Sequence, residues 1–357
     1  MINLSSYKNK KVFITGHTGF KGSWLGLWLN KLGAEIKGYA LEPDTKPNHF
    51  DLLKLNIDSE INNINDGEAL KLSIQTFQPE IIFHLAAQPL VIASYQNPVE
   101  TFKTNVMGTL NVLEAARTCK AVKAIVVVTT DKVYENKEQD EGYIETDNLG
   151  GNDPYSASKA CAEIVTKSYS MSFFNPSEQN ALVASVRSGN VIGGGDWAKF
   201  RLVPDIIRAV IDNQNLEIRY PNSTRPWQHV LDCLYGYLLL GEKLLEGKKE
   251  YTGSWNFGPI VNLGIPVQEI IKMASEYFPN VQLNINFLES LHESEKLQLD
   301  AGKARQKLGW EPLYNDRSLF TETFKWYNDY YTKGEVNSHY ILDQYLGKLK
   351  TMNHHAI

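Results

Sequence analysis

The chain has 357 residues, of which 43% are hydrophobic, and it carries a formal net charge of −5 at pH 7. This composition is that of a globular protein with a sizeable core, and the acidic balance argues against a nucleic-acid partner. No stretch approaches the roughly 20 apolar residues of a membrane helix, so we expect no membrane partner and a cytoplasmic location. Three cysteines, Cys119, Cys161 and Cys233, lie far apart without a CxxC spacing, which indicates neither disulfides nor a metal site.

The first half of the chain alternates short apolar runs with helical patterns. Strands are predicted where β-branched and other apolar residues follow one another, at 11–15, 35–40, 80–85, 122–129 and 181–187. Helices are predicted where the apolar spacing is longer, at 23–32, 99–117 and 154–174. Strands that alternate with helices indicate βαβ units, and so an α/β fold with a Rossmann-type, doubly wound parallel sheet.

The pattern changes after Arg187, where a glycine run at 193–195 and several prolines and aromatic residues interrupt the alternation. We therefore predict a Rossmann domain over 1–187, with later returns near 231–262, and mainly a smaller C-terminal substrate-binding lobe over 188–357. Ligands of open α/β sheets bind beyond the carboxyl ends of the strands, where such a lobe would lie. The polar tail from Lys350 to Ile357 is expected to fray.

A glycine-rich loop of spacing GxxGxxG follows the first strand and opens the first helix. Such glycines let the backbone approach a pyrophosphate at the positive end of a helix. The residues expected to bind a dinucleotide cofactor here are Gly16, His17, Gly19, Phe20, Lys21 and Gly22. No arginine follows the second strand to meet a 2′-phosphate, so NAD is favoured over NADP. Glu42 is a candidate for the ribose hydroxyls, and an exposed loop carboxylate is an equally good interpretation.

A tyrosine and a lysine stand four residues apart at Tyr155 and Lys159, at the start of a predicted helix. Residues at this spacing share a helix face. A lysine beside a tyrosine is expected to lower the pKa of the phenol, which makes it a general base near neutral pH. The strand at 122–129 ends where Thr129 or Thr130 would lie beside the tyrosine.

These three motifs, in this order, resemble those of the extended short-chain dehydrogenase/reductase superfamily. The sequences HLAA at 84–87, NVMGT at 105–109 and LGWEP at 308–312 are similar to its secondary signatures, and the resemblance covers nearly the whole chain. It implies that Tyr155 and Lys159 are the catalytic pair and also contact NAD, with Thr130 as the third member.

The resemblance also implies further contacts to the cofactor. The segment after the third predicted strand would lie beside it, with residues Leu85, Ala86 and Ala87. Asp66 looks like the aspartate that touches adenine, while a helix N-cap is the simpler interpretation.

The sequence TTDKVY at 129–134 bears on which member of the superfamily this is. Epimerases usually carry small residues after the strand, whereas nucleotide-sugar 4,6-dehydratases carry an aspartate that helps to expel the 6-hydroxyl. Asp131 resembles that acid, and a turn-forming aspartate is the alternative. Most such dehydratases continue with glutamate as the base for the C5 proton, where this chain has Lys132.

The lysine resembles the branch of these dehydratases that acts on CDP-glucose, as do the stretches at 16–25, 150–159, 189–198 and 225–230. Lys132 would either take the C5 proton as a neutral amine or only stabilise the enolate, with Tyr155 or a water making the transfer. The reaction implied is that of a hydro-lyase which converts CDP-glucose to CDP-4-keto-6-deoxyglucose. It oxidises C4, loses water across C5–C6 and returns hydride from the cofactor to C6, so it has no net redox change.

The second half supplies the expected contacts to a nucleotide-diphosphate hexose, because arginines donate bidentate hydrogen bonds to phosphates. By resemblance, Asn190 and Arg225 would hold the diphosphate, Arg201 would line the same site, and Asn256 would lie near the nucleotide. A surface ion pair is the alternative for any single arginine.

The resemblance also implies an assembly and a pathway. The helices at 99–117 and 154–174 would pair in a homodimer or homotetramer, or would merely cover the sheet. The pathway implied is deoxysugar biosynthesis, as for the O-antigen of lipopolysaccharide.

Two other functions stay open. A nucleotide-sugar epimerase or reductase would use the same cofactor, and Asp131 argues against it. An NAD-binding regulatory protein without chemistry would typically lack Tyr155 or Lys159, and both are present.

Overall fold

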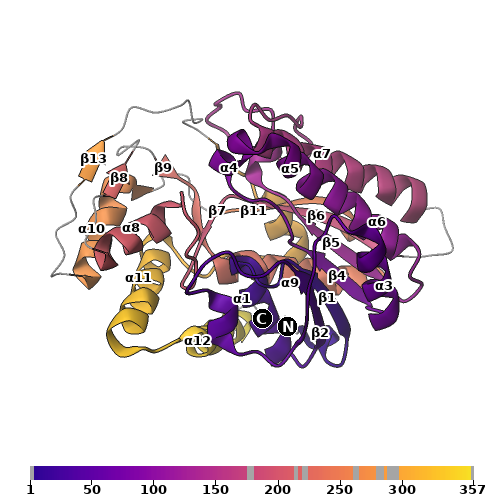
Figure 1. The fold of residues 1–357 in the computed structure, drawn as a ribbon, viewed down its shortest axis with the longest axis horizontal. Helices are drawn as coiled ribbons and strands as arrows, with labels where there is room; N and C mark the ends of the chain where they lie inside the picture. Colours follow the sequence, from indigo (N-terminus) through magenta and orange to yellow (C-terminus); the bar gives the residue numbers. More distant parts are fainter. Residues whose placement is uncertain are drawn as a thin grey trace.

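A computed structural model gives the fold of the chain (Figure 1). The structure describes residues 4–174, 181–212, 216–218, 224–259, 265–278, 285–287 and 297–354. In Figure 1 a larger body built on one sheet stands beside a smaller group of helices and short strands. Among the described residues, no helix combines the length and the apolar character needed to cross a membrane.

Seven strands form the main sheet, in the order β11-β6-β5-β4-β1-β2-β3, and all neighbours are parallel. Their bounds are β1 Lys11–Thr15, β2 Glu35–Ala40, β3 Asp58–Ile61, β4 Ile81–His84, β5 Ala124–Val128, β6 Leu182–Ser188 and β11 Gly253–Phe257. The strand order reverses between β1 and β4, and open sheets bind ligands at such a switch point. The prediction of a Rossmann-type doubly wound sheet is confirmed.

Alternate residues of the central strands point into two separate cores. Ile14 and Phe83 belong to one buried cluster, whereas Phe13 and Ile82, their neighbours in sequence, belong to the other. Because both faces are buried, these strands are apolar at nearly every position, which is typical of parallel sheets.

Helices cover both faces of the sheet (Figure 1). The principal ones are α1 Phe20–Lys31 and α9 Val230–Leu245 on one face, and α3 Gly67–Phe77, α6 Gly108–Arg117 and α7 Pro154–Tyr169 on the other. The single helix expected at 99–117 is divided. It consists of α5 Pro98–Phe102, a π-helical turn at Lys103–Met107, and α6. The sequence pattern did not reveal this turn, because a π turn continues the helix and changes only the hydrogen-bond spacing of one turn, from i→i+4 to i→i+5.

The remaining elements connect the sheet or form the smaller lobe. They are η1 Leu4–Tyr7, α2 His49–Leu53, α4 Val91–Gln96, η3 Asp131–Val133, η4 Ser170–Phe174, β7 Asn190–Ile192, α8 Leu202–Ile211, β8 Leu216–Ile218, β9 Thr224–Arg225, β10 Trp227–His229, η5 Lys249–Tyr251, β12 Ile265–Pro266, α10 Val267–Tyr277, β13 Ile285–Phe287, η6 Ala304–Leu308, α11 Asp316–Lys333 and α12 Ser338–His354. The prediction that the tail frays from Lys350 is wrong as far as His354, because α12 is anchored by the buried Leu342 and Tyr345.

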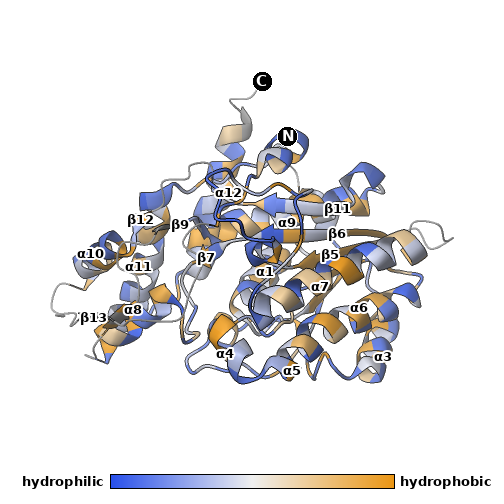
Figure 2. Cartoon of the chain, turned by 90° about the horizontal axis from the view of Figure 1, so that it is seen from above, coloured by the Kyte–Doolittle hydropathy of each residue, from blue (hydrophilic) through white to orange (hydrophobic). Residues whose placement is uncertain are grey.

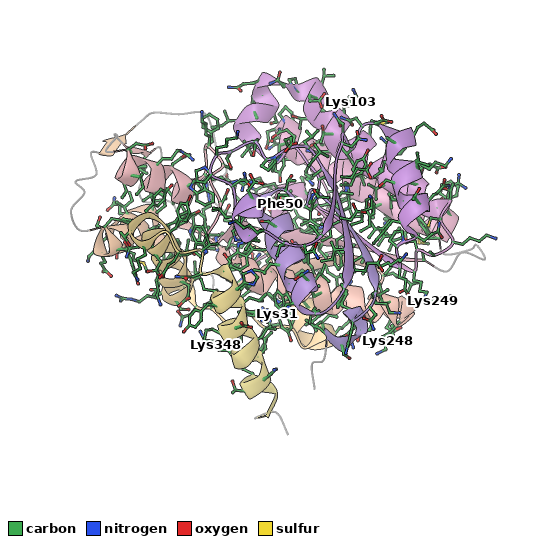
Figure 3. All side chains as sticks on the ribbon, turned by 60° about the horizontal axis from the view of Figure 1, so that its bottom comes forward. Lys31, Phe50, Lys103, Lys248, Lys249 and Lys348 are labelled. Carbon is green, nitrogen blue, oxygen red and sulfur yellow. The ribbon has the colours of Figure 1, made fainter. Side chains whose placement is uncertain are left out.

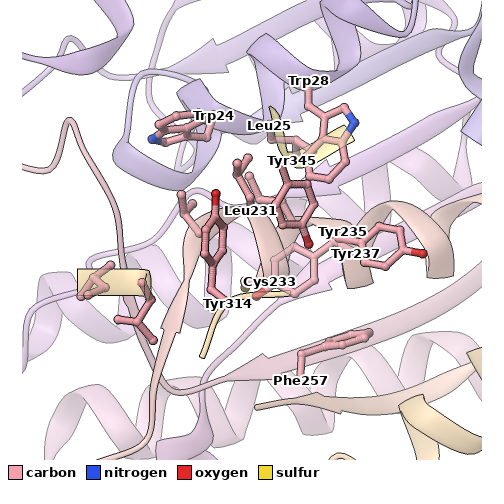
Figure 4. Close-up of a cluster of buried hydrophobic side chains, with 14 of the residues drawn as sticks. Trp24, Leu25, Trp28, Leu231, Cys233, Tyr235, Tyr237, Phe257, Tyr314 and Tyr345 are labelled. Atoms are coloured by element: carbon pink, nitrogen blue, oxygen red, sulfur yellow. The ribbon is translucent and has the colours of Figure 1, made fainter. Parts of the chain in front are cut away.

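After the first segment of the smaller lobe, the chain returns to the main sheet with α9 and β11. α9 packs on one face and β11 extends the sheet beside β6. Figure 4 shows Trp24 and Trp28 of α1 together with Tyr235 of α9 and Tyr345 of α12 in one buried cluster. The same core continues into the lobe.

Candidate functional site

The glycine loop at the switch point leaves no room for side chains. Gly16 has a φ of +75°, and a Cβ there would lie 2.7 Å from the amide nitrogen of Ala86. A Cβ at Gly22 would lie 2.0 Å from the carbonyl oxygen of Gly16. Helix α1 begins at Gly19 without a side-chain cap. A backbone loop that leads into an uncapped helix N-terminus fits the pyrophosphate of a dinucleotide.

His17 and Lys21 extend from this loop in different directions. His17 is buried, bonds to the hydroxyl of Ser59 through Nε2 at 2.7 Å, and packs edge-on against Phe50, which Figure 3 labels. Burial lowers the pKa of His17 to about 4, so its ring is neutral at pH 7. Lys21 instead donates its ammonium to the hydroxyl of Ser188 at 2.9 Å, at the carboxyl end of β6.

The structure places Tyr155 and Lys159 on the buried face of α7. The Asp153 side chain caps this helix by accepting from the Ser156 amide at 2.9 Å. The ammonium of Lys159 donates to the carbonyl of Val128, at the end of β5, at 3.0 Å. The tyrosine and the lysine therefore lie where the central strand ends.

The expected lowering of the tyrosine pKa is not what this structure shows. Burial raises the pKa of Tyr155 to about 12, and its hydrogen bond with Thr130 offsets only part of that rise. Burial, and then the charge of Lys21, lower the pKa of Lys159 to about 8. Burial outweighs the neighbouring groups for both residues, because both are enclosed between α7 and the sheet.

Asp131 completes this group. The Thr130 hydroxyl donates to its carboxylate at 2.9 Å, and Asp131 is 4% exposed. A Cβ at Gly189 would lie 3.0 Å from Asp131 Oδ2, so the glycine leaves room for the carboxylate. Of the two threonines considered, Thr130 bonds to Tyr155, whereas Thr129 donates to Glu163 at 2.5 Å. Lys132 follows half-buried, and its backbone amide bonds to Thr130 at 3.4 Å.

A buried ion pair between α7 and β6 adjoins these residues, and it was not predicted from the sequence. Glu163 accepts from the Arg187 guanidinium through both carboxylate oxygens, at 3.0 and 2.9 Å. Arg187 also donates to the Tyr134 hydroxyl at 2.7 Å. The available signal was the spacing, because Glu163 follows Lys159 by four residues and so shares its helix face.

The predicted substrate residues fall into two groups. Asn190 begins β7 and pairs with Trp227 of β10, while Arg225 lies two residues earlier in β9. Arg201 precedes α8, bonds to Asp196 at 2.9 Å, and acts electrostatically on Tyr155. Arg201 thus lies within electrostatic range of Tyr155, and Asn190 follows Gly189, which adjoins Asp131.

Asn256 does not join this group. It is fully buried on β11, where its amide donates to the carbonyls of Tyr143 and Asp300 and accepts from the Tyr134 hydroxyl. The side chain exposes no polar atom to a ligand in this fold.

The remaining predicted cofactor contacts lie around the switch point. Asp66 caps α3 by accepting from Ala69 at 3.0 Å, which is the simpler of its two interpretations. The amides of Leu85 and Ala86 bond to the Thr15 hydroxyl at 3.1 and 3.2 Å. This fixes the segment after β4, which continues to Ala87, next to Gly16.

Comparison with known proteins agrees with this arrangement. Residues 13–323 match the family model described as GDP-mannose 4,6 dehydratase. The CDP-glucose 4,6-dehydratase of Salmonella typhimurium is 46% identical over 333 residues, which cover 92% of this chain and 93% of that protein.

Two solved structures share the fold. One is the epimerase Mth375 from Methanothermobacter thermautotrophicus, with a TM-score of 0.78 and 23% identity over 92% of this chain and 95% of that one. The other is a dTDP-glucose 4,6-dehydratase from Bacillus anthracis in complex with NAD, with a TM-score of 0.75 and 22% identity over 90% and 97%. The family match spans most of the chain and the Salmonella relative aligns along almost all of it, so this chain belongs to the GDP-mannose 4,6 dehydratase family.

Proposed function

We propose that this chain is an NAD-dependent hydro-lyase that converts CDP-glucose to CDP-4-keto-6-deoxyglucose. The observation that carries the proposal is the position of Asp131. Its buried carboxylate bonds to Thr130, which in turn bonds to Tyr155, so an acid and a base lie at one site. The 46% identity to the Salmonella enzyme supports CDP-glucose as the substrate.

Each residue of the group has a distinct part in the proposed reaction. Tyr155 takes the proton from the sugar O4, and Thr130 orients its phenol. Lys159 holds positive charge beneath the tyrosine, fixed by its bond to Val128. Asp131 protonates the departing 6-hydroxyl, as a general acid must where a poor leaving group is expelled. Lys132 is the nearest cation in sequence to this acid. We propose that it either removes the C5 proton as a neutral amine or stabilises the negative charge of the enolate that this removal leaves.

The loop residues fit NAD as the cofactor. When bound, NAD would accept hydride from C4 and return it to C6. The backbone at Gly16, Gly19 and Gly22 would hold its pyrophosphate, and at Gly16 and Gly22 only a glycine leaves space for the loop. The Bacillus relative of the same fold was solved with NAD, which supports the assignment. His17, Phe20, Lys21, Asp66 and the segment Leu85, Ala86 and Ala87 stay predicted cofactor contacts.

The substrate diphosphate would lie over the lobe strands. Asn190 lies in β7, which pairs with β10, Arg225 lies two residues before β10, and the charge of Arg201 acts on Tyr155. We keep these three as proposed substrate contacts. We leave Asn256 out of the proposed site, because its amide is already bonded within the protein.

We also propose a homodimer or homotetramer formed through the helices at 99–117 and 154–174, which comprise α5 to α6 and α7 with η4. Figure 2 shows α4, α5, α6 and α7 on the same side of the molecule. Large apolar side chains are exposed along this side, namely Tyr95, Val99, Phe102, Met107, Ile164, Met171 and Phe173. Contiguous exposed apolar residues of this kind mark protein interfaces.

Three broader assignments stay proposals. The division into a Rossmann domain over 1–187, with returns near 231–262, and a lobe over 188–357 agrees with the position of β11 in the sheet, although 260–262 lie outside the described residues. A cytoplasmic location is proposed by analogy with the relatives of this family. A role in deoxysugar biosynthesis for O-antigen lipopolysaccharide would follow from a 4-keto-6-deoxy product.

The deciding experiment is incubation of purified protein and NAD with CDP-, dTDP-, UDP- and GDP-hexoses, followed by mass spectrometry. The expected result is loss of one water from CDP-glucose without accumulation of NADH. An unchanged mass with inverted C4 would show an epimerase instead. Turnover of a different nucleotide would keep the reaction and refute the CDP assignment.

A further inference from the structure

The loop at 193–198 is held in place by contacts with two helices, α1 and α11. Trp24 of α1 donates its indole N–H to the carbonyl of Gly194 at 2.9 Å. A Cβ at Gly194 would lie 2.1 Å from the ring of Trp326 in α11, so the backbone rests directly on that ring. The loop therefore has a fixed position relative to the glycine loop and to the lobe.

Asp196 follows these glycines and is fixed in turn. Its backbone amide donates to the Tyr327 hydroxyl at 2.9 Å, and that hydroxyl donates to its carbonyl at 2.5 Å. The two carboxylate oxygens have different partners. Oδ1 accepts from the Ala198 amide at 3.0 Å within the loop, and Oδ2 accepts from the Arg201 guanidinium at 2.9 Å.

Within this arrangement, Arg201 is the residue that connects the loop with the candidate active site. Its charge acts on both Tyr155 and Lys21, so it lies within electrostatic range of these two residues. About a third of its side chain is exposed, at 32%. The guanidinium carries five donors and the pair with Asp196 uses one of them, which leaves others for an anionic ligand.

We propose that Asp196 is a positioning residue that holds Arg201 ready for the diphosphate of the substrate. A long side chain that is fixed before the ligand arrives does not lose its freedom on binding, and this increases affinity. Asp196 is 5% exposed and bonded within its own loop, so it contacts Arg201 and not the ligand. The inference rests on the proposed function for the identity of the anion, a nucleoside diphosphate.

The test is Asp196→Asn, which keeps Oδ1 as acceptor for Ala198 and removes the charge beside Arg201. We expect KM for CDP-glucose to rise about tenfold, the size of one charge-assisted hydrogen bond, with kcat nearly unchanged. The Kd of CDP, measured by calorimetry, should weaken by a similar factor. Glu246→Gln is the control, because that carboxylate pairs with Lys248 in another part of the chain, and it should leave both constants unchanged.

A double-mutant cycle separates positioning from general loop stability. In an Arg201→Met background, Asp196→Asn should change the Kd of CDP by less than about twofold, because its partner is gone. Losses that simply add would overturn the proposal. If Asp196→Asn is insoluble, Arg201→Lys replaces it, because an ammonium keeps the charge but loses the planar fork. A KM for that variant equal to wild type would also overturn the proposal.

Failure of the proposed function gives a different pattern. If the wild-type protein dehydrates no nucleotide sugar, the function is wrong. The positioning role of Asp196 is then tested only by the double-mutant cycle, in which the Kd of CDP is measured by calorimetry. If the wild-type protein dehydrates CDP-glucose and Asp196→Asn keeps the wild-type KM and Kd, the function stands and the positioning role is wrong.

Discussion

Asp131 has one carboxylate oxygen bonded to Thr130 and the other directed toward Gly189. Asparagine has the same shape and keeps an acceptor for Thr130, but it has no proton to give to a leaving hydroxyl. Asp131→Asn should therefore lower dehydration of CDP-glucose by about 10² to 10⁴, the usual contribution of a general acid. Loss of water is measured by mass spectrometry, and Glu135→Gln in the following loop is the control. Wild-type loss of water by Asp131→Asn would show that Asp131 is not the general acid.

Gly189 provides a steric test of the same carboxylate. A Cβ added there would lie 3.0 Å from Asp131 Oδ2 and 3.4 Å from the carbonyl of Pro226, so Asp131 must shift by a few tenths of an ångström. Gly189→Ala should lower kcat about tenfold, because misplacement of a catalytic group on this scale weakens the transition state. Gly347→Ala on α12 is the control, because nothing lies within 4 Å of its added Cβ. Equal kcat values for the two variants would show that Asp131 does not need its present position.

The buried charge of Lys159 lowers the free energy of unfolding of the protein. Its pKa is about 8 in the folded protein against an ordinary value of 10.5, so the folded state binds this proton less tightly than the unfolded state. The penalty is fully present below pH 8 and disappears as pH rises to 10.5. By linkage it is on the order of 3 kcal/mol at pH 7.

Lys159→Met should therefore unfold at higher urea concentration than wild type at pH 7, although it should be inactive. Its advantage should shrink between pH 8 and pH 10.5, when wild-type Lys159 loses its own charge. The lost hydrogen bond to Val128 reduces the gain by about 1 kcal/mol. A stability difference that does not change across this pH range would contradict the assigned pKa.

Helix α7 carries the proposed catalytic pair, Tyr155 and Lys159, on the same buried face as one half of an ion pair. Its Glu163 is paired with Arg187, and both side chains are almost fully buried. Glu163→Gln leaves the guanidinium buried without its counter-charge, which should cost about 3 to 5 kcal/mol in the free energy of unfolding. Chemical denaturation measures the loss. Glu114→Gln removes an exposed glutamate paired with Arg117 and should cost less than about 1 kcal/mol.

The same pair gives the helix a dependence on acid. Burial opposes ionisation, but Arg187 and the neighbouring hydroxyls outweigh it, so the pKa of Glu163 is lowered. A lowered pKa contributes stability that is present above the ordinary value of about 4.3 and is lost as pH falls further. Wild type should lose stability more steeply below pH 4 than Glu163→Gln does. Parallel pH profiles would show that the glutamate is not held as an anion.

At the scale of elements, the sequence predicted those helices and strands whose position is determined by a local pattern of apolar residues. β1 and β2 occur at the predicted residues, because apolar β-branched runs bounded by polar residues and glycines are local signals. The division of the 99–117 helix was missed, because a π turn leaves the spacing of apolar residues almost intact. The Glu163–Arg187 pair was missed because its partners belong to different elements.

The contacts that complete the site depend on the whole fold. Lys21 bonds to Ser188 across 167 residues of sequence. The side-chain amide of Asn256 bonds to carbonyls more than 40 residues away in sequence. No spacing rule connects residues at such distances. The resemblance placed Tyr155, Lys159 and Thr130 at one site, but only packing shows that burial raises the pKa of the tyrosine.

The proposed assembly is also a property of the whole molecule. Val99 is 80% exposed on α5 and Ile164 is 56% exposed on α7. The double substitution Val99→Glu and Ile164→Glu should yield a monomer in sedimentation velocity, because like charges would face each other across the interface. Leu72→Glu on α3 changes a residue that is 66% exposed outside this surface, and it should leave the sedimentation coefficient of wild type unchanged. A monomeric wild type would refute the assembly.

The return of the chain to the sheet decides where this protein can be divided. Because β11 bonds to β6 and α9 covers the sheet, a fragment ending at Arg187 would expose an open strand edge and an apolar face. Such a fragment should aggregate when expressed alone. A chimera that exchanges the lobe for that of a relative must therefore keep 230–257 with the sheet and replace the segments on either side. Recombination between relatives would meet the same restriction.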